Sequence, residues 1–153
     1  MARFDGSNTV STVGSNYDHY LTSLGSINNI PIAVGDGGYS GNKKVESLQD
    51  GRWKIMGDFP FVEDIISQYS FVTFEGGIYI FGKIFNLYRF FKRKFNLGGF
   101  ADFRESNLVA QMDENGFDQN IWTNMGTLST RRRGHRSIVL ENKIVHVGGD
   151  WTK

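Results

Sequence analysis

Three histidines are the side chains of this chain best suited to acid–base or metal chemistry: His19, His135 and His146. No two of them have the spacing of a metal-ligand pair. His19 and His135 both stand at the start of a predicted hairpin, and this recurrence favours a structural role. His146 takes the place of Ile80 in a second, similar segment, which favours packing or a polar channel lining. We therefore predict no catalytic, cofactor-binding or metal-binding residue.

Carboxylates and arginines give no catalytic pattern either. One aspartate stands at the turn before each predicted outer strand, where it suits turn formation: Asp5, Asp50 and Asp113. The chain has no phosphate-binding loop, serine nucleophile elbow or paired-carboxylate signature. The basic run RRRGHR contains three arginines that we expect near a loop face, where they could contact an acidic protein partner: Arg131, Arg133 and Arg136.

The composition excludes several classes of protein. The absence of cysteine excludes disulfides, thiolate metal sites and cysteine nucleophiles. A net charge of +1 gives no overall attraction to nucleic acid or membrane. The N-terminus lacks the apolar core of a signal peptide, no apolar run approaches the length of a membrane span, and no Asn-x-Ser/Thr acceptor occurs. These features favour a cytoplasmic protein with no nucleic-acid or membrane partner in this segment, and no cofactor.

Short apolar runs separated by turn residues predict hairpins that recur along the chain. Residues 69–82 and 135–149 superimpose without a gap, and Asn142 suits the positive φ of a tight turn. Residues 19–35 form a looser third copy, with a turn about three residues longer at 26–29 by the same comparison. The three segments predict three equivalent hairpins.

A second unit, strand–turn–strand, follows each of the first two hairpins. Residues 45–60 and 108–128 share a Trp, a Met three positions later and a Gly four positions later: Trp53, Met56 and Gly57, and Trp122, Met125 and Gly126. Residues 2–14 resemble this unit, because Asp5-Gly6 stands where residues 45–60 have Asp50-Gly51, although the Trp is missing.

Hairpin and outer unit together give four strands. Once about 16 residues around 83–97 are set aside, the repeat length is about 48 to 53 residues, which is typical of β-propeller blades. We therefore predict an all-β fold of about 2.5 four-stranded antiparallel blades in an incomplete ring. The predicted parts are an end strand of a preceding blade (2–14), a blade (19–60), a blade with an insertion at 83–97 (69–128), and the start of a further blade (131–153).

These signals resemble the kelch repeat family. An apolar strand ends in Gly-Gly, an aromatic follows, and Trp then Met stand beyond a turn; Arg132, Gly134 and His135 add an Arg-x-Gly-His pattern. The motif residues are Gly37, Gly38, Tyr39, Trp53, Met56, Gly82, Gly98, Gly99, Phe100, Trp122, Met125, His135, Gly148 and Gly149. The resemblance implies a non-enzymatic module that binds a protein partner through propeller loops, in a fragment of a larger propeller.

Two alternatives stay open for function. Some propellers of this kind are enzymes, such as copper radical oxidases and sialic acid epimerases. The oxidase type needs a cysteine, which this chain lacks, so the enzyme alternative is an epimerase-like fragment. The other alternative is a nonfunctional, truncated product that contains a retained intron.

The segment Lys83–Leu97 has three interpretations: a solvated loop insertion, a basic and aromatic element for nucleic acid or a membrane surface, or a translated in-frame intron. Removing residues 83–98 joins Gly82 to Gly99, which restores a Gly-Gly pair and the repeat length together. Gly82-Lys83 can be encoded with a splice-donor consensus and Leu97-Gly98 with an acceptor AG. The intron is the favoured interpretation.

Overall fold

The computed structural model describes residues 2–4, 10–17, 19, 24–35, 43–61, 65–85, 108–130 and 134–149. The described residues contain two four-stranded antiparallel sheets, two two-stranded sheets and a single helical turn, α2 (Glu114–Phe117). The all-β prediction is confirmed, and the sheets are blades of an incomplete propeller.

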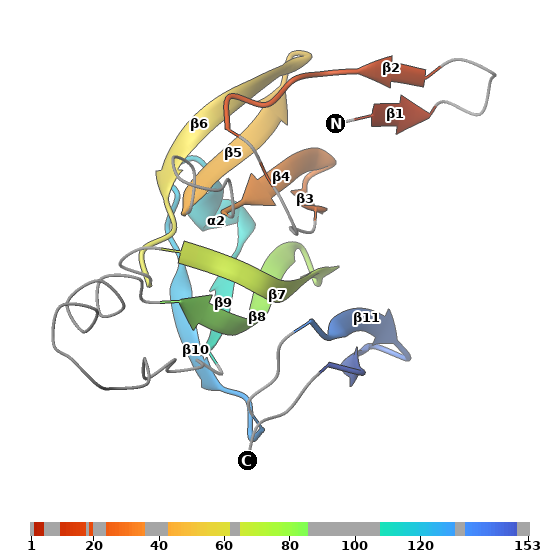
Figure 1. The fold of residues 1–153 in the computed structure, drawn as a ribbon, viewed down its shortest axis with the longest axis vertical. Helices are drawn as coiled ribbons and strands as arrows, with labels where there is room; N and C mark the ends of the chain where they lie inside the picture. The colour runs from red at the N-terminus through yellow and green to blue at the C-terminus, as the bar shows by residue number, and fades with distance from the viewer. Residues whose placement is uncertain are drawn as a thin grey trace, which may run out of the picture.

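The first complete blade has the order β3-β4-β5-β6 and the second the order β10-β9-β8-β7. Their strands are β3 (Leu24–Ile27), β4 (Ile30–Val34), β5 (Lys44–Gln49) and β6 (Arg52–Asp58), then β7 (Ile65–Phe74), β8 (Gly77–Phe85), β9 (Leu108–Met112) and β10 (Thr123–Thr127). The two half blades are β1 (Ala2–Phe4) with β2 (Val10–Thr12), and β11 (Arg136–Leu140) with β12 (Lys143–Val147). Figure 1 shows the half blades at the two ends of the row of sheets.

All three inner hairpins turn on two residues with positive φ, as type I′ turns require. The turn residues are Asn28 and Asn29 (φ 50° and 63°), Glu75 and Gly76 (46° and 74°), and Glu141 and Asn142 (47° and 56°). Phe74 pairs with Gly77 and Leu140 with Lys143, so the gapless superposition is confirmed. The longer turn predicted at 26–29 is wrong, because Ile27 pairs directly with Ile30.

The recurring Trp-x-x-Met-Gly is a β-bulge in each outer pair. Between β5 and β6, Val45 pairs with Gly57 and Glu46 with Ile55, which leaves Met56 as the extra residue. Between β9 and β10 the same shift leaves Met125 unpaired. The glycines that follow have φ of 150° and 108°, backbone that favours glycine. In the outer pair β1–β2, Phe4 pairs with Val10, and the predicted turn residues Asp5 and Gly6 lie outside the described residues.

The pairing also measures the extra chain in the second blade. Val34 pairs with Val45, 11 residues later, whereas Phe81 pairs with Val109, 28 residues later. The second connection is therefore 17 residues longer, close to the length set aside above. β8 continues through Lys83 to Phe85 and pairs there with β7. Residues 86–97 lie outside the described residues.

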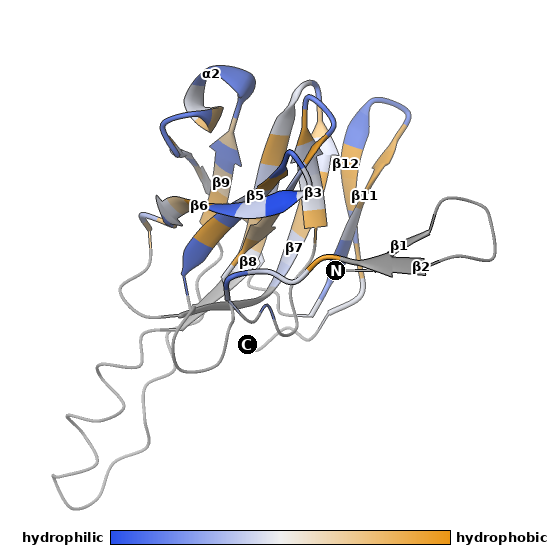
Figure 2. Ribbon diagram, turned by 90° about the horizontal axis from the view of Figure 1, so that it is seen from above, coloured by the Kyte–Doolittle hydropathy of each residue, from blue (hydrophilic) through white to orange (hydrophobic). Residues whose placement is uncertain are grey.

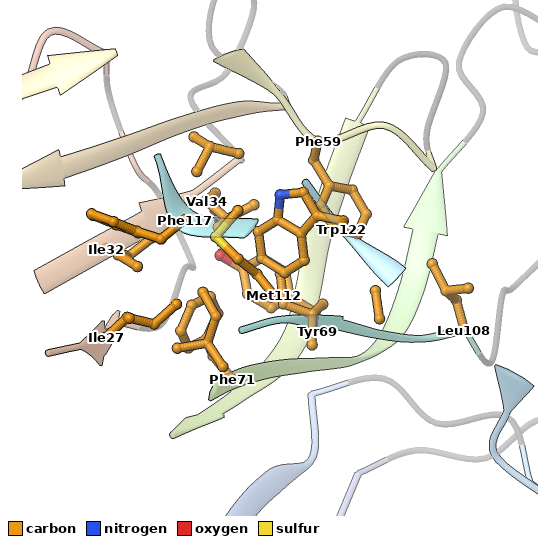
Figure 3. Close-up of a cluster of buried hydrophobic side chains, with 14 residues drawn as sticks. Ile27, Ile32, Val34, Phe59, Tyr69, Phe71, Leu108, Met112, Phe117 and Trp122 are labelled. Atoms are coloured by element: carbon orange, nitrogen blue, oxygen red, sulfur yellow. Dashed lines mark hydrogen bonds between the residues drawn. The ribbon is translucent and has the colours of Figure 1, made fainter. Parts of the chain in front are cut away.

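The main hydrophobic core lies between the two complete blades, and Figure 3 shows its side chains converging from both. Trp122 meets Phe59 edge to face, with ring centroids 4.9 Å apart, and Phe59 belongs to the segment that leaves β6. The innermost strands are also joined, because Thr73 Oγ1 accepts from the Ser26 amide at 3.0 Å and donates to the Ser26 carbonyl at 3.1 Å. Trp122 thus packs between adjacent blades.

Candidate interaction surface

A buried carboxylate in β5 is the most densely bonded polar group of the described residues. The side chain of Glu46 has no solvent exposure. Its Oε1 accepts from the backbone amide of Asn16 at 3.1 Å and from Asn16 Nδ2 at 2.6 Å. Its Oε2 accepts from the Tyr17 amide at 3.2 Å and lies 2.7 Å from His19 Nε2. Glu46 therefore holds the segment that leads from β2 to β3 against the first blade.

The cluster fixes its own side chains within the fold. Four contacts occupy the two carboxylate oxygens of Glu46, two at each oxygen, which is the full set of acceptor sites that a carboxylate offers. His19 is fixed at its other nitrogen too, because Nδ1 lies 2.9 Å from the Gly35 carbonyl. The position equivalent to Glu46 in the second blade is Ala110, so the repeat itself does not require a carboxylate.

His19 and His135 are not equivalent, contrary to the sequence prediction. Counted back from the first turn residue, His135 lies six positions before Glu141 and His19 lies nine before Asn28. The residue of the second blade that corresponds to His135 is Tyr69, six positions before Glu75. Both rings are buried, and the Tyr69 hydroxyl donates to the carbonyl of Val34 in the neighbouring blade. A buried ring at this position therefore packs one blade against the next.

His146 and Ser137 face each other across the β11–β12 hairpin. Ser137 Oγ lies 2.8 Å from His146 Nδ1, and the His146 ring packs edge to face on Phe81 of the second blade at 4.5 Å. His135 lies 5.5 Å from His146, ring to ring. These rings pack the half blade against β8, in agreement with the predicted packing role. Across the described ranges, no group of three His, Asp or Glu side chains is placed to hold a metal ion.

Of the predicted motif residues, the structure describes Trp53, Met56, Gly82, Trp122, Met125, His135, Gly148 and Gly149. Gly148 and Gly35 directly follow β12 and β4, at φ of 71° and 61°, whereas Gly82 lies within β8 at φ of 121°. Gly149 follows at 86°. Trp53 and Trp122 are both buried, at 7% exposure. The remaining motif glycines and aromatics lie outside the described residues: Gly37, Gly38, Tyr39, Gly98, Gly99 and Phe100.

Of the three arginines predicted to meet a partner, Arg136 is described. It is exposed at the start of β11, and its guanidinium donates to the carbonyl of His135 at 3.3 Å. Arg131 and Arg133 lie outside the described residues. The structure therefore places one of these charges at the surface of the half blade.

The sequence reading missed an exposed apolar surface on the same hairpin, where Figure 2 shows apolar residues on both strands. Val147 is 57% exposed, whereas its equivalents Val34 and Phe81 are 0% and 5% exposed. Those two residues pair with a third strand, β5 or β9, and β12 has no such strand among the described residues. The other exposed apolar side chains of the hairpin are Ile138, Val139 and Leu140. We call β12 and these four side chains the open half blade.

The hairpin is nevertheless anchored to the second blade. Its innermost strand β11 lies beside β7, and Asn142 at its turn donates to Glu75 Oε1 at 3.4 Å. Together with the His146–Phe81 contact, these interactions hold the inner half of a third blade in place, with its outer edge uncovered by any described strand.

No helix of the described residues is long and apolar enough to span a membrane.

No family model and no curated protein sequence matches the chain. Solved structures do match, and YjhT is one of them, with a TM-score of 0.62 and 16% sequence identity over 88% of this chain. The chain spans 35% of the length of YjhT. At this level of identity the likeness concerns the fold alone.

Proposed function

We propose that this chain is part of a kelch-type β-propeller that binds another polypeptide and carries out no chemistry of its own. The kelch resemblance supports a binding role, and the open half blade is the observation that carries it. Its backbone edge and its apolar side chains lie together on one hairpin.

The edge of β12 is built to accept a strand. In the two complete blades the equivalent strands, β4 and β8, each bond a third strand along this edge. The register directs the backbone groups of Ile144 to this side, because Ile144 stands at a non-hydrogen-bonded position relative to β11. Strand addition at such an edge gives affinity through main-chain bonds, and neighbouring side chains give specificity.

The apolar side chains supply the area that such an interface needs. Val139, Leu140 and Val147 are between 43% and 57% exposed. Leu140 and Val147 share one face of the hairpin with Ile138, and Val139 lies on the other face. An exposed apolar face of this kind is typical of an interaction site. Arg136 pairs with Val147 at the far end of the hairpin from the turn, which adds a positive charge at the rim.

A labelled peptide of residues 108–128 tests this function, because this segment covers the equivalent edge of β8. We expect saturable binding in a fluorescence anisotropy titration. The variant Ile144→Pro removes the outward amide and should weaken binding by about tenfold. The repeat tolerates proline here, since Pro31 holds the equivalent position in β4.

The matched control Ile144→Val keeps the amide and the branched side chain, so it should bind the peptide like the parent chain. Absence of saturable binding, or equal binding by Ile144→Pro, would contradict strand addition at β12.

A further inference from the structure

We propose that Asn115 is a site of spontaneous deamidation, and that the hydrogen bond between Asp113 and the Gly116 amide sets its rate. The modification is independent of the polypeptide binding proposed above, and it acts on the contact between the two complete blades. Asn115-Gly116 is the one Asn-Gly step in the sequence. Glycine has no Cβ, so its amide nitrogen can approach the preceding side chain more closely than that of other residues.

The reaction uses the Gly116 amide nitrogen as the nucleophile. Hydroxide removes the amide proton, and the nitrogen lone pair forms a bond to Cγ of Asn115. The Cγ–Nδ2 bond breaks, and the Nδ2 group takes a proton from water and leaves as ammonia. A second water then opens the cyclic imide at either of its two carbonyl carbons, which gives aspartate or isoaspartate at position 115. Water is the only co-reactant consumed.

The structure exposes the reacting side chain but holds the nucleophile. Asn115 is exposed in α2, so water and hydroxide reach its amide. Gly116 is buried, its N–H donates to Oδ1 of Asp113 at 2.9 Å, and its carbonyl accepts from the Ile121 amide at 2.8 Å. The Asp113 side chain therefore retains the proton that must be removed. Ring closure requires α2 to open, because Gly116 must give up these hydrogen bonds.

The packing of α2 also explains why the reactive step is present. A Cβ at Gly116 would lie 2.6 Å from the carbonyl oxygen of Ile121, so a larger residue does not fit without a backbone shift. The corresponding turn of the first blade is the two-residue Asp50-Gly51, between the paired Gln49 and Arg52. The Asn-Gly step thus belongs to a turn that the second blade has in addition to the repeat.

Deamidation at this position should weaken the contact between the blades. Isoaspartate adds one carbon to the main chain directly before Gly116, so the bonds of Gly116 to Asp113 and Ile121 no longer fit together. The next residue, Phe117, lies in the core between the blades, and Asn120 Nδ2 donates to the carbonyl of Asp58 in the first blade at 2.9 Å. The modified chain should therefore unfold at a lower urea concentration.

Peptide mapping of the full chain tests the inference. The chain is incubated at mildly alkaline pH and digested, and the peptide that contains Asn115 is followed by mass spectrometry, with isoaspartate and aspartate separated by elution. A synthetic peptide of residues 113–118 gives the rate without the fold. We expect the chain to react about tenfold more slowly than this peptide, because hydrogen bonds must break first. Asp113→Ala should react about fivefold faster than the parent chain, which corresponds to the loss of a typical N-cap.

Three further variants separate the effect of the hydrogen bond from general destabilisation. Asp113→Ser keeps an N-cap acceptor and should restore a slow rate. Glu114→Ala removes the neighbouring carboxylate without touching the cap, and Gly25→Ala weakens the fold at the distant contact with Phe71, so both should react like the parent chain. Asn115→Gln should give no product, because its ring would be one atom larger.

Equal rates for the parent chain and the peptide would overturn the inference. A rate for Asp113→Ala no higher than that of Glu114→Ala would also overturn it, as would acceleration by Gly25→Ala to the same extent. If Asp113→Ala does not fold, the ratio between parent chain and peptide and the rate of Asp113→Ser decide. A deamidated chain with the urea midpoint of the parent would refute the weakened contact between the blades.

Discussion

His19 Nε2 lies 2.7 Å from Oε2 of Glu46, a carboxylate with no exposure to solvent and 27 residues away in sequence. Buried polar groups are stable in proteins when they are fully hydrogen bonded, and Glu46 meets this condition. The interaction joins the connection after β2 to the middle strand of the first blade.

Replacing Glu46 with alanine should lower the free energy of unfolding by about 3–5 kcal/mol, because four hydrogen bonds to a fully buried acceptor are lost together and Asn16, Tyr17 and His19 lose their partner. Glu46→Gln keeps one carbonyl acceptor and should cost about 1–3 kcal/mol. Urea unfolding followed by circular dichroism measures both. Since alanine occupies the same position at Ala110, a loss below about 1 kcal/mol for Glu46→Ala would show that the cluster is dispensable.

Gly25 in β3 is packed beneath the ring of Phe71. A Cβ at this position would lie 1.7 Å from Cε1 of Phe71, too close for any side chain. Gly25→Ala should therefore displace the ring at the contact between blades and cost about 1–3 kcal/mol. The equivalent residues Val72 and Ile138 show that the repeat itself allows a larger side chain.

The control for this prediction is Gly14→Ala, because a Cβ at Gly14 meets nothing within 4 Å. It should leave the urea midpoint unchanged. The double variant Gly25→Ala with Phe71→Leu should recover part of the loss, and equal costs for the alanine variants at positions 25 and 14 would refute the packing argument.

Local chemistry explains which parts of the fold the sequence predicts. Three features depend on residues that are close together in the chain: turns with Asn or Gly at positive φ, paired glycines, and the Trp-x-x-Met-Gly bulge. The sequence predicts too long a turn in the first hairpin, because Asn28-Asn29 is followed by Ile30-Pro31, which is typical of a longer loop. Pro31 fits in β4 because its missing N–H would point away from β3.

The candidate site was less predictable than the fold, because its interactions are not local. A glutamate in an alternating strand is expected to face solvent, whereas Glu46 is buried. Its hydrogen-bond partners lie 27 to 30 residues earlier in the sequence. The exposure of Val147 follows from its neighbours and not from its own type, because no described strand lies beside β12, whereas valine at the equivalent Val34 is fully buried. Neither feature has a signature in the nearby sequence.

Alkaline pH should destabilise the protein through Tyr79. Burial raises the pKa of Tyr79 above its ordinary value of 10.0, and the nearby carboxylates of Glu75 and Asp113 raise it further. Above pH 10 the unfolded chain loses the phenolic proton first, so the free energy of unfolding falls as the pH rises toward the folded pKa. Urea unfolding at pH 9 and pH 11 measures this fall.

Tyr79→Phe should reduce the alkaline loss without abolishing it. The remaining part comes from Lys44, whose pKa is raised by its hydrogen bond to Asp58 at 2.5 Å, so its stabilising effect also disappears above its ordinary value of 10.5. An unchanged pH dependence in Tyr79→Phe would exclude Tyr79 as a source.

Deleting residues 83–98 should leave a cooperatively folding protein. The connection between Phe81 and Val109 would then contain 11 residues, against 10 between Val34 and Val45, and the shorter loop should raise the free energy of unfolding by about 0.8 kcal/mol. Loss of the Ile84 and Phe85 pairs with β7 opposes this gain. We expect the deletion variant to have a urea midpoint at or above that of the parent chain. Loss of cooperative unfolding in this variant would show that residues 83–98 are part of the fold. The coding sequence offers a second check, because a translated intron requires GT after the first base of the Gly82 codon.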